Sequence, residues 1–154
     1  MRQTPTVPIA TVTGADLPEL LPLVRAYCDF YEVEPTDDDL LSLSRALIAD
    51  PEGEGVQLLA RDEGGSATGF ATLYWSWSTL HAARVGIMYD LFVAENERRG
   101  GVGRALIEAC AERCRERGIK VLTWTTATDN ERAQSLYDAL GGVGEEWIEY
   151  ELEL

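Results

Sequence analysis

The chain has 154 residues, 45% of them hydrophobic, and this size and composition predict one globular domain with a substantial core rather than a disordered chain. Its 27 acidic and 13 basic residues give a formal net charge of −14, so nucleic acid is not an expected partner. No apolar run is as long as a membrane span, and the first residues lack the apolar stretch of a signal peptide. We therefore expect a cytoplasmic protein without a membrane partner.

One strand and two helices are expected first along the chain. Residues 8–12 form a short apolar run that is typical of a strand. Asp16, followed by a leucine and a proline, is typical of a helix start, and Thr36 with acids at 37–39 marks a second helix whose positive end carries the negative charges. The middle and C-terminal parts of the chain then alternate between strand and helix patterns.

Residues 62–65, Asp-Glu-Gly-Gly, are expected to be the turn of an antiparallel hairpin between two runs of strand-forming residues. A last strand is expected at 146–152, at the edge of the sheet, because its polar and apolar residues alternate. The other expected strands cover 57–61, 69–75, 86–93 and 120–126. The pattern as a whole predicts an α+β protein with a mixed sheet.

The cysteines and the histidine argue against metal chemistry. Cys110 and Cys114 fall on the apolar face of one expected helix, where they would serve as small buried hydrophobic residues, as would Cys28. His81 is the only histidine and lies in a loop-like segment, so neither a zinc site nor a histidine-based nucleophile is expected. We expect no metal cofactor.

Residues 98–104, Arg-Arg-Gly-Gly-Val-Gly-Arg, lie between the strand expected at 86–93 and an amphipathic helix. Glycines before a helix let backbone N–H groups approach an anion, and the helix dipole adds positive potential; a plain strand-to-helix turn would also use such glycines. Two nucleotide motifs do not fit. A P-loop needs Lys and then Ser or Thr after its last glycine, and a G-x-G-x-x-G motif meets Leu106 where its last glycine belongs.

Two motifs and a strand point to one family. Arg98, Gly101 and Gly103 satisfy R-x-x-G-x-G, and residues 130–141 match N-x-x-A-x-x-L-Y-x-x-L-G. With the strand end Asp90-Leu91-Phe92-Val93, they resemble in order and spacing the GNAT superfamily of N-acetyltransferases. In that family the first motif is the coenzyme A pyrophosphate signature, and the strand carries a bulge.

The resemblance implies a fold and a co-substrate. It implies one GNAT domain over residues 1–154, with a mixed, mostly antiparallel sheet, helices on both faces and a splay between the fourth and fifth strands. Acetyl-CoA would bind with its pantetheine arm in that splay, like an added strand. The expected coenzyme contacts are Leu91, Phe92, Val93, Arg98, Arg99, Gly100, Gly101, Val102, Gly103, Arg104 and Asn130, the last of which would also cap its helix.

The resemblance implies that Tyr137 protonates the departing thiolate, although its helical neighbours would also suit a packed core tyrosine. Within the family, the sequence pattern most resembles that of the spermidine/spermine (diamine) N-acetyltransferases, in which a glutamate precedes the aspartate that corresponds to Asp90. Tyr89 occupies that position here, so the base stays open. Asp90 is either the base or a structural residue, and deprotonation through ordered water near Tyr89 or Glu32 is the alternative.

The function expected is transfer of an acetyl group to a primary amine of a small, cationic acceptor. Glu32 and Glu34 lie in an acidic joint that would face the acceptor side of a GNAT fold, although the acidity is also compatible with a merely solvated surface. The alternatives are acetylation of a protein N-terminus or lysine, and a non-catalytic acyl-CoA-binding regulator. A homodimer is expected because oligomers are common in the family.

Overall fold

The computed structural model describes residues 6–98 and 100–154. In chain order the elements are β1 (Ile9–Thr11), η1 (Gly14–Asp16), α1 (Leu17–Phe30), α2 (Asp37–Ala49), β2 (Gly55–Arg61), β3 (Ala67–Ser78), β4 (Ala83–Val93), η2 (Glu95–Glu97), α3 (Val102–Glu116), β5 (Leu122–Thr123) and α4 (Glu131–Ala139). They divide into two compact units, one up to Trp124 and one from Thr125 onward. None of the helices in these described residues is long and apolar enough to cross a membrane.

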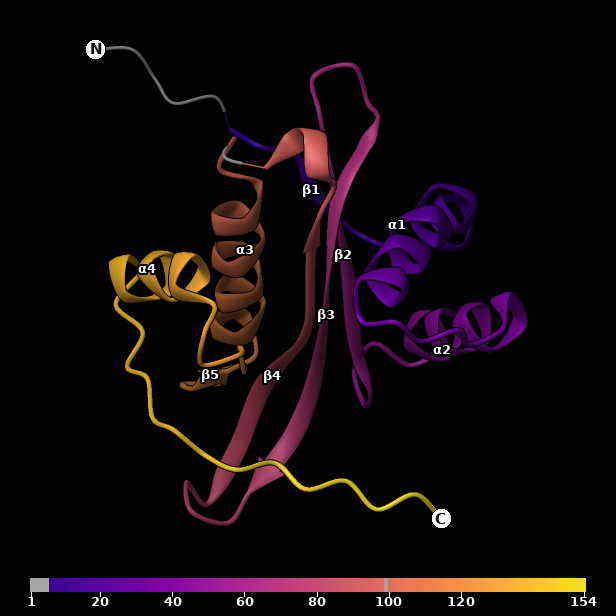
Figure 1. Ribbon diagram of the computed structural model, residues 1–154. Coiled ribbons are helices and arrows are strands. Elements are labelled where there is room, and N and C mark those ends of the chain that lie inside the picture. The colour runs from indigo at the N-terminus through magenta and orange to yellow at the C-terminus, as the bar shows by residue number, and fades with distance from the viewer. Residues whose placement is uncertain (1–5, 99) are drawn as a thin grey trace. The chain divides into compact units, whose positions relative to one another are not determined.

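The first unit contains one sheet with the strand order β1-β2-β3-β4-β5. Neighbouring strands are antiparallel except β4 and β5, which are parallel. Helices α1 and α2 cover one face of this sheet, and α3 covers the other (Figure 1). The predicted α+β class, the mixed and mostly antiparallel sheet and the helices on both faces are confirmed. The predicted hairpin is β2–β3, whose turn is closed by a hydrogen bond from Asp62 N–H to the Ser66 carbonyl.

Local sequence explains where the helices of the first unit begin. The side chain of Thr36 accepts a hydrogen bond from Asp39 N–H, as a helix cap does, and the three aspartates of the first turn of α2 lie at the positive end of its dipole. Helix α1 carries a proline in its first turn, where a missing N–H costs no helical hydrogen bond. Both starts were predicted from sequence.

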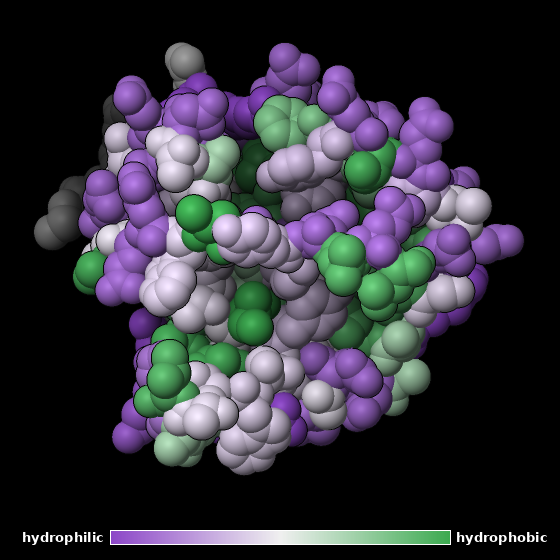
Figure 2. All heavy atoms as spheres, turned by 60° about the horizontal axis from the view of Figure 1, so that its bottom comes forward, coloured by the Kyte–Doolittle hydropathy of each residue, from purple (hydrophilic) through white to green (hydrophobic). Residues whose placement is uncertain are grey.

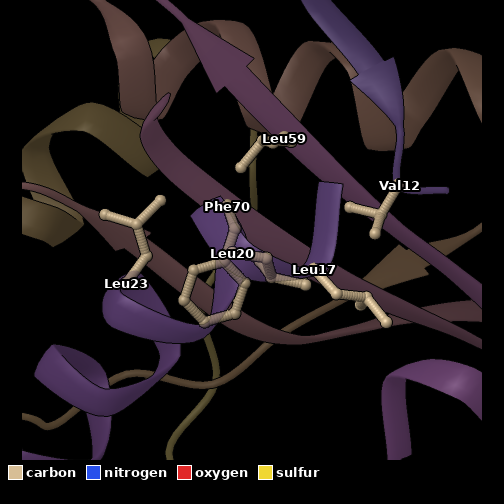
Figure 3. Close-up of a cluster of buried hydrophobic side chains, with 6 residues drawn as sticks. All are labelled: Val12, Leu17, Leu20, Leu23, Leu59 and Phe70. Atoms are coloured by element: carbon tan, nitrogen blue, oxygen red, sulfur yellow. The ribbon is translucent and has the colours of Figure 1, made fainter. Parts of the chain in front are cut away.

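The core that fixes α1 on the sheet joins residues from four segments. Val12, Leu17, Leu20, Leu23, Leu59 and Phe70 lie against one another in Figure 3, and all are buried. Burying a leucine or phenylalanine side chain contributes about 1.5–3 kcal/mol, so this cluster holds the helix firmly. Tyr27, two turns beyond Leu20, packs against the same cluster and is thereby held over the middle of the sheet.

Two expectations for the C-terminal strands are corrected. The fifth strand was expected over residues 120–126 but pairs with β4 only through Leu122 and Thr123. Residues 146–152 form no strand, and Trp147, Ile148 and Tyr150 are exposed. An alternating pattern supplies the side chains for a strand, but a strand also needs a neighbour that accepts its backbone hydrogen bonds, and the pattern says nothing about that neighbour.

Figure 2 shows a face on which hydrophilic, intermediate and hydrophobic residues are mixed. Single exposed apolar side chains are normal in globular proteins, so this face by itself marks no interface.

Candidate active site

The N-terminus of α3 is built to accept an anion. Gly101 caps the helix in the left-handed region, with φ of 83° and ψ of 7°, which glycine adopts without the strain of a Cβ. The first helical bond runs from Ala105 N–H to the Gly101 carbonyl, so the N–H groups of Val102, Gly103 and Arg104 precede the intrahelical ladder. These N–H groups and the positive end of the dipole fit a phosphate.

Two of the three predicted arginines of this loop can be placed. The Arg98 Nε donates to the Val93 carbonyl at 3.1 Å, and its guanidinium carbon lies 5.9 Å from the centre of the Phe92 ring. The Arg104 Nε pairs with a Glu108 carboxylate oxygen at 3.0 Å, one helical turn along α3. Both arginines are exposed. Arg99 lies outside the described residues. The loop therefore presents fixed cations as well as backbone donors.

One edge of β4 is open. The parallel neighbour β5 pairs with Gly86 and Ile87 alone, so within the described residues β4 has no strand partner on that side from Met88 onward. Ala94 N–H donates to the Thr68 carbonyl on the β3 side, and strand alternation then directs the backbone groups of Leu91 and Val93 away from β3. This opening is the predicted splay, and it fits an extended chain.

Phe92 lies between these two residues and has the opposite backbone orientation. It pairs with Phe70 on β3, so its main-chain groups do not face the open edge. Its ring instead packs against Tyr27 at a centroid distance of 6.2 Å and lies beneath the Arg98 guanidinium. Any coenzyme contact of Phe92 is therefore limited to its side chain.

A β-bulge lies where the family resemblance predicts one. Thr72 pairs with Asp90 and Leu73 with Met88, which leaves Tyr89 as the extra residue of β4. The Tyr89 ring contacts Tyr74 at a centroid distance of 5.6 Å, whereas Asp90 lies opposite Thr72, whose hydroxyl lowers the pKa of the Asp90 carboxyl. Residues 72 and 74 lie on the same face of β3, so the bulge brings the side chains of two consecutive β4 residues to that one face.

The surroundings of Asp90 affect its ionisation in two opposite ways. Burial raises the pKa of its carboxyl, and hydrogen bonds from the hydroxyls of Thr72 and Tyr27 act in the other direction. Burial and the nearby Asp90 charge raise the pKa of Tyr27 far above its ordinary value, and burial, Asp90 and Tyr89 raise the pKa of Tyr74 to about 12. The phenols of Tyr27 and Tyr74 therefore stay protonated at neutral pH, and Asp90 is the carboxylic acid beside them.

Sequence reasoning missed Tyr27, Thr72 and Tyr74 as neighbours of Asp90. Tyr27 falls within the helix expected after Asp16, and Thr72 and Tyr74 fall within the strand expected at 69–75, but neither expectation placed them beside Asp90. A signal was available, because Thr72 is a polar residue that interrupts an apolar strand and is fully buried. A buried hydroxyl needs a hydrogen-bond partner, and such an interruption therefore points to one.

The acidic joint lies on the surface between α1 and α2. Glu32 and Glu34 are exposed, and Glu32 adopts a left-handed conformation with φ of 57°. Asp37, at the start of α2, forms an ion pair with Arg25, so part of the acidic cluster is already neutralised within the protein. Glu32 and Glu34 have exposed carboxylates and remain the candidates for attracting a cation.

Asn130 and Tyr137 belong to the second unit. The Asn130 side chain accepts a hydrogen bond from Ala133 N–H at 3.2 Å, so its predicted role as the cap of α4 is confirmed. Gly141, with φ of 89°, ends the helix together with a bond from Gly142 N–H to the Tyr137 carbonyl. Tyr137 is half-buried in the last turns of α4.

Comparisons with known proteins agree with this architecture. The acetyltransferase (GNAT) family model matches residues 20–141. The chain is 32% identical over 127 residues to the uncharacterized N-acetyltransferase YhfO of Bacillus subtilis, covering 82% of this chain and 83% of that protein. It is 26% identical over 149 residues to a thialysine N-epsilon-acetyltransferase of Caenorhabditis elegans, covering 94% and 91%.

A solved structure described as a probable acetyltransferase has a TM-score of 0.82 at 30% identity and covers 96% of this chain and 97% of its own. The open strand edge and the helix N-terminus are the two places where the family resemblance puts the co-substrate. The chain belongs to the acetyltransferase (GNAT) family and is an acetyl-CoA-dependent N-acetyltransferase.

Proposed function

We propose that the acceptor is a small molecule with a reactive primary amine and a further positive charge, as in diamines and related amino compounds. The observation that carries this proposal is the Asp90 carboxylate, held beside aromatic side chains at the bulge of β4 and next to its open edge. Carboxylates and aromatic faces both attract cations. A relative that spans most of this chain is named for acetylating the ε-nitrogen of thialysine, which supports an amine acceptor of this kind and a place near the diamine subgroup.

In this proposal acetyl-CoA supplies the activated acetyl thioester, and the chain binds and orients it. The N–H groups of Val102, Gly103 and Arg104 would hold the pyrophosphate, with Arg98 and Arg99 as charge-assisted donors. Leu91 and Val93 offer backbone groups to the pantetheine arm, although the Val93 carbonyl already accepts from Arg98. Asn130 would contact the same arm from the N-terminus of α4.

The acetyl transfer needs a base and an acid. The Asp90 carboxylate takes a proton from the acceptor ammonium, which becomes a neutral amine and attacks the thioester carbonyl carbon. Collapse of the tetrahedral intermediate breaks the C–S bond, and Tyr137 gives its phenolic proton to the departing thiolate. The proton lost from the new amide nitrogen reprotonates the Tyr137 phenolate, and the proton held by Asp90 passes to solvent. The acceptor ammonium and acetyl-CoA thus give the amide, the coenzyme A thiol and one proton. Tyr89 or Glu32 acting through water are the alternative bases.

Glu32 and Glu34 would attract the second charge of the acceptor. Both are exposed, so their attraction is screened by salt and should affect substrate capture more than the chemical step.

A homodimer is part of the proposal. Trp147, Ile148, Tyr150 and Leu152 lie in the C-terminal segment with 79–88% of their surface exposed, which is unusual for large apolar side chains so close together in the chain. A second copy would cover them. Sedimentation of the full chain would show a species of twice the 17.0 kDa monomer mass.

The test of function is release of free coenzyme A thiol from acetyl-CoA across diamines, neutral monoamines, amino acids and peptides. Turnover that is fastest with diamines or basic amino compounds supports the proposal. Turnover with peptides alone would show a protein acetyltransferase instead, and binding of acetyl-CoA without turnover of any acceptor would show a non-catalytic acyl-CoA-binding protein.

A further inference from the structure

Three polar residues form a row across the centre of the sheet. Gln57 on β2 pairs with Thr72 on β3, which pairs with Asp90 on β4, so the three side chains lie side by side on the face that α1 and α2 cover. The row beside it is Leu59, Phe70 and Phe92, which belongs to the apolar core. Gln57 and Thr72 are 4% and 0% exposed, so this row is as deeply buried as its apolar neighbour.

The hydrogen bonds along the row have a direction. The Gln57 Nε2 donates to the Thr72 Oγ1 at 3.2 Å, so the threonine oxygen is the acceptor in that bond. A threonine hydroxyl has one hydrogen, and with its oxygen engaged by Gln57 that hydrogen is available to Asp90, which is paired with Thr72 on the neighbouring strand and whose pKa the hydroxyl lowers. Gln57 therefore orients the hydroxyl that holds Asp90.

The polar row of Gln57, Thr72 and Asp90 lowers the stability of the folded state, and the fold does not need a polar residue at position 57. Among the described residues, the Gln57 Oε1 is a buried oxygen without a hydrogen-bond partner, and such an atom destabilises the folded state. Leucine at position 57 would extend the apolar core and remove the unpaired oxygen. Turning the Gln57 amide over would pair its oxygen with the Thr72 hydroxyl, but that hydroxyl would then no longer donate to Asp90.

Groups on α1 and on β3 interact electrostatically with Asp90. From α1 come the Tyr27 hydroxyl, which donates to the carboxylate, and the buried Cys28 thiol, whose pKa is raised mainly by burial. From β3 come Thr72 and the half-buried Tyr74. These neighbours include no ammonium or guanidinium that acts on Asp90, so hydroxyl donors are the means by which the protein stabilises its charge.

We propose that Thr72, oriented by Gln57, is a positioning residue that fixes the Asp90 carboxylate and keeps it ionised to receive the proton of the acceptor ammonium. This inference rests on the proposed role of Asp90 as the base. In this inference Gln57 and Thr72 set the pH at which the base works, although neither residue reaches the acceptor.

The direct test measures the pKa of Asp90 by carbon NMR of the carboxyl group in the wild type, Thr72→Val and Thr72→Ser, with Asp90→Asn to identify the signal. Thr72→Val removes the donor and should raise this pKa by about one unit or more, whereas Thr72→Ser keeps the hydroxyl and should leave it within a few tenths of a unit. Gln57→Leu, which also removes the unpaired oxygen and should fold well, should raise the pKa by a smaller amount. An Asp90 pKa that is the same in all four proteins overturns the inference.

The kinetic test separates this inference from the proposed function. If both hold, the acidic limb of the kcat/KM profile should move to higher pH in Thr72→Val by the same amount as the NMR pKa, with the serine variant unchanged. A shifted NMR pKa with an unmoved acidic limb would show that Asp90 is not the base, which overturns the proposed mechanism. In the remaining outcome, the acidic limb of the wild type agrees with the NMR pKa of Asp90, but neither the limb nor this pKa shifts in Thr72→Val. That outcome overturns the inference and leaves the proposed role of Asp90 as the base standing.

Discussion

Thr72 and Asp90 are paired across β3 and β4 immediately beside the bulge at Tyr89, and the threonine hydroxyl lowers the pKa of the carboxyl. Without the bulge, Tyr89 and Asp90 would project to opposite faces of the sheet. The extra residue therefore places one carboxylate and one phenol on the same face, next to the edge of β4 that β5 leaves open.

Replacing Asp90 by asparagine should separate activity from stability. If Asp90 is the base, kcat should fall by roughly 10²- to 10⁴-fold. Because burial raises the pKa of this carboxyl in the folded state, its ionised form destabilises the protein at pH values above that pKa and not below the unfolded value near 3.9. Asp90→Asn should therefore gain melting temperature relative to wild type at pH 8 and lose that advantage at pH 4. A variant of unchanged activity would make Asp90 a structural residue.

Replacing Tyr137 by phenylalanine should lower kcat by roughly 10²- to 10⁴-fold at saturating acetyl-CoA, because the thiolate then departs without a positioned acid. The affinity for acetyl-CoA should change little. Tyr150→Phe, at an exposed tyrosine of the same unit, is the matched control and should be fully active. Equal rates for the two variants would assign Tyr137 to packing.

Gly101 and Gly65 form a matched pair for testing the phosphate site. Both have left-handed φ angles, 83° and 87°, and a Cβ at either position would meet no protein atom within 4 Å. Alanine should therefore destabilise the fold by about 1 kcal/mol at each position. Only Gly101→Ala places a methyl group at the N-terminus of α3, so it alone should raise the KM for acetyl-CoA, by about tenfold if one charge-assisted hydrogen bond is lost. Similar KM values in the two variants would place the phosphates elsewhere.

The attraction of a cationic acceptor should depend on salt. For a diamine, kcat/KM should fall as ionic strength rises, because exposed charges are screened beyond about 10 Å at 0.1 M salt. Glu32→Gln and Glu34→Gln should raise the KM for the diamine more than they lower kcat. Glu63→Gln, in the exposed β2–β3 turn, is the control and should behave as wild type. Equal, salt-insensitive rates for a diamine and a neutral monoamine would rule out the cationic acceptor and leave the acetyltransferase activity intact.

Much of the candidate site follows from interactions between residues that are close in the chain. A glycine at the left-handed cap of α3, the Thr36 cap of α2 and the Asn130 cap of α4 each depend on hydrogen bonds or dihedral angles within one helical turn. Such features leave a signature in the sequence, and the family motifs added the bulge of β4. The prediction of a strand at 146–152 was wrong because a strand needs a neighbouring strand for its backbone hydrogen bonds, and local sequence does not specify that neighbour.

Only the tertiary structure decided what surrounds Asp90. Gln57 and Thr72 are 15 residues apart and meet through strand register, and Tyr27 reaches the same carboxylate because the core around Leu20 and Phe70 fixes α1 over it. Register is a property of paired strands, and a shift of one residue would turn all of these side chains to the other face. Sequence by itself determined the chemistry of the glycine- and arginine-rich loop before α3, because that chemistry depends on neighbouring residues. The folded sheet determined which polar groups surround the candidate base.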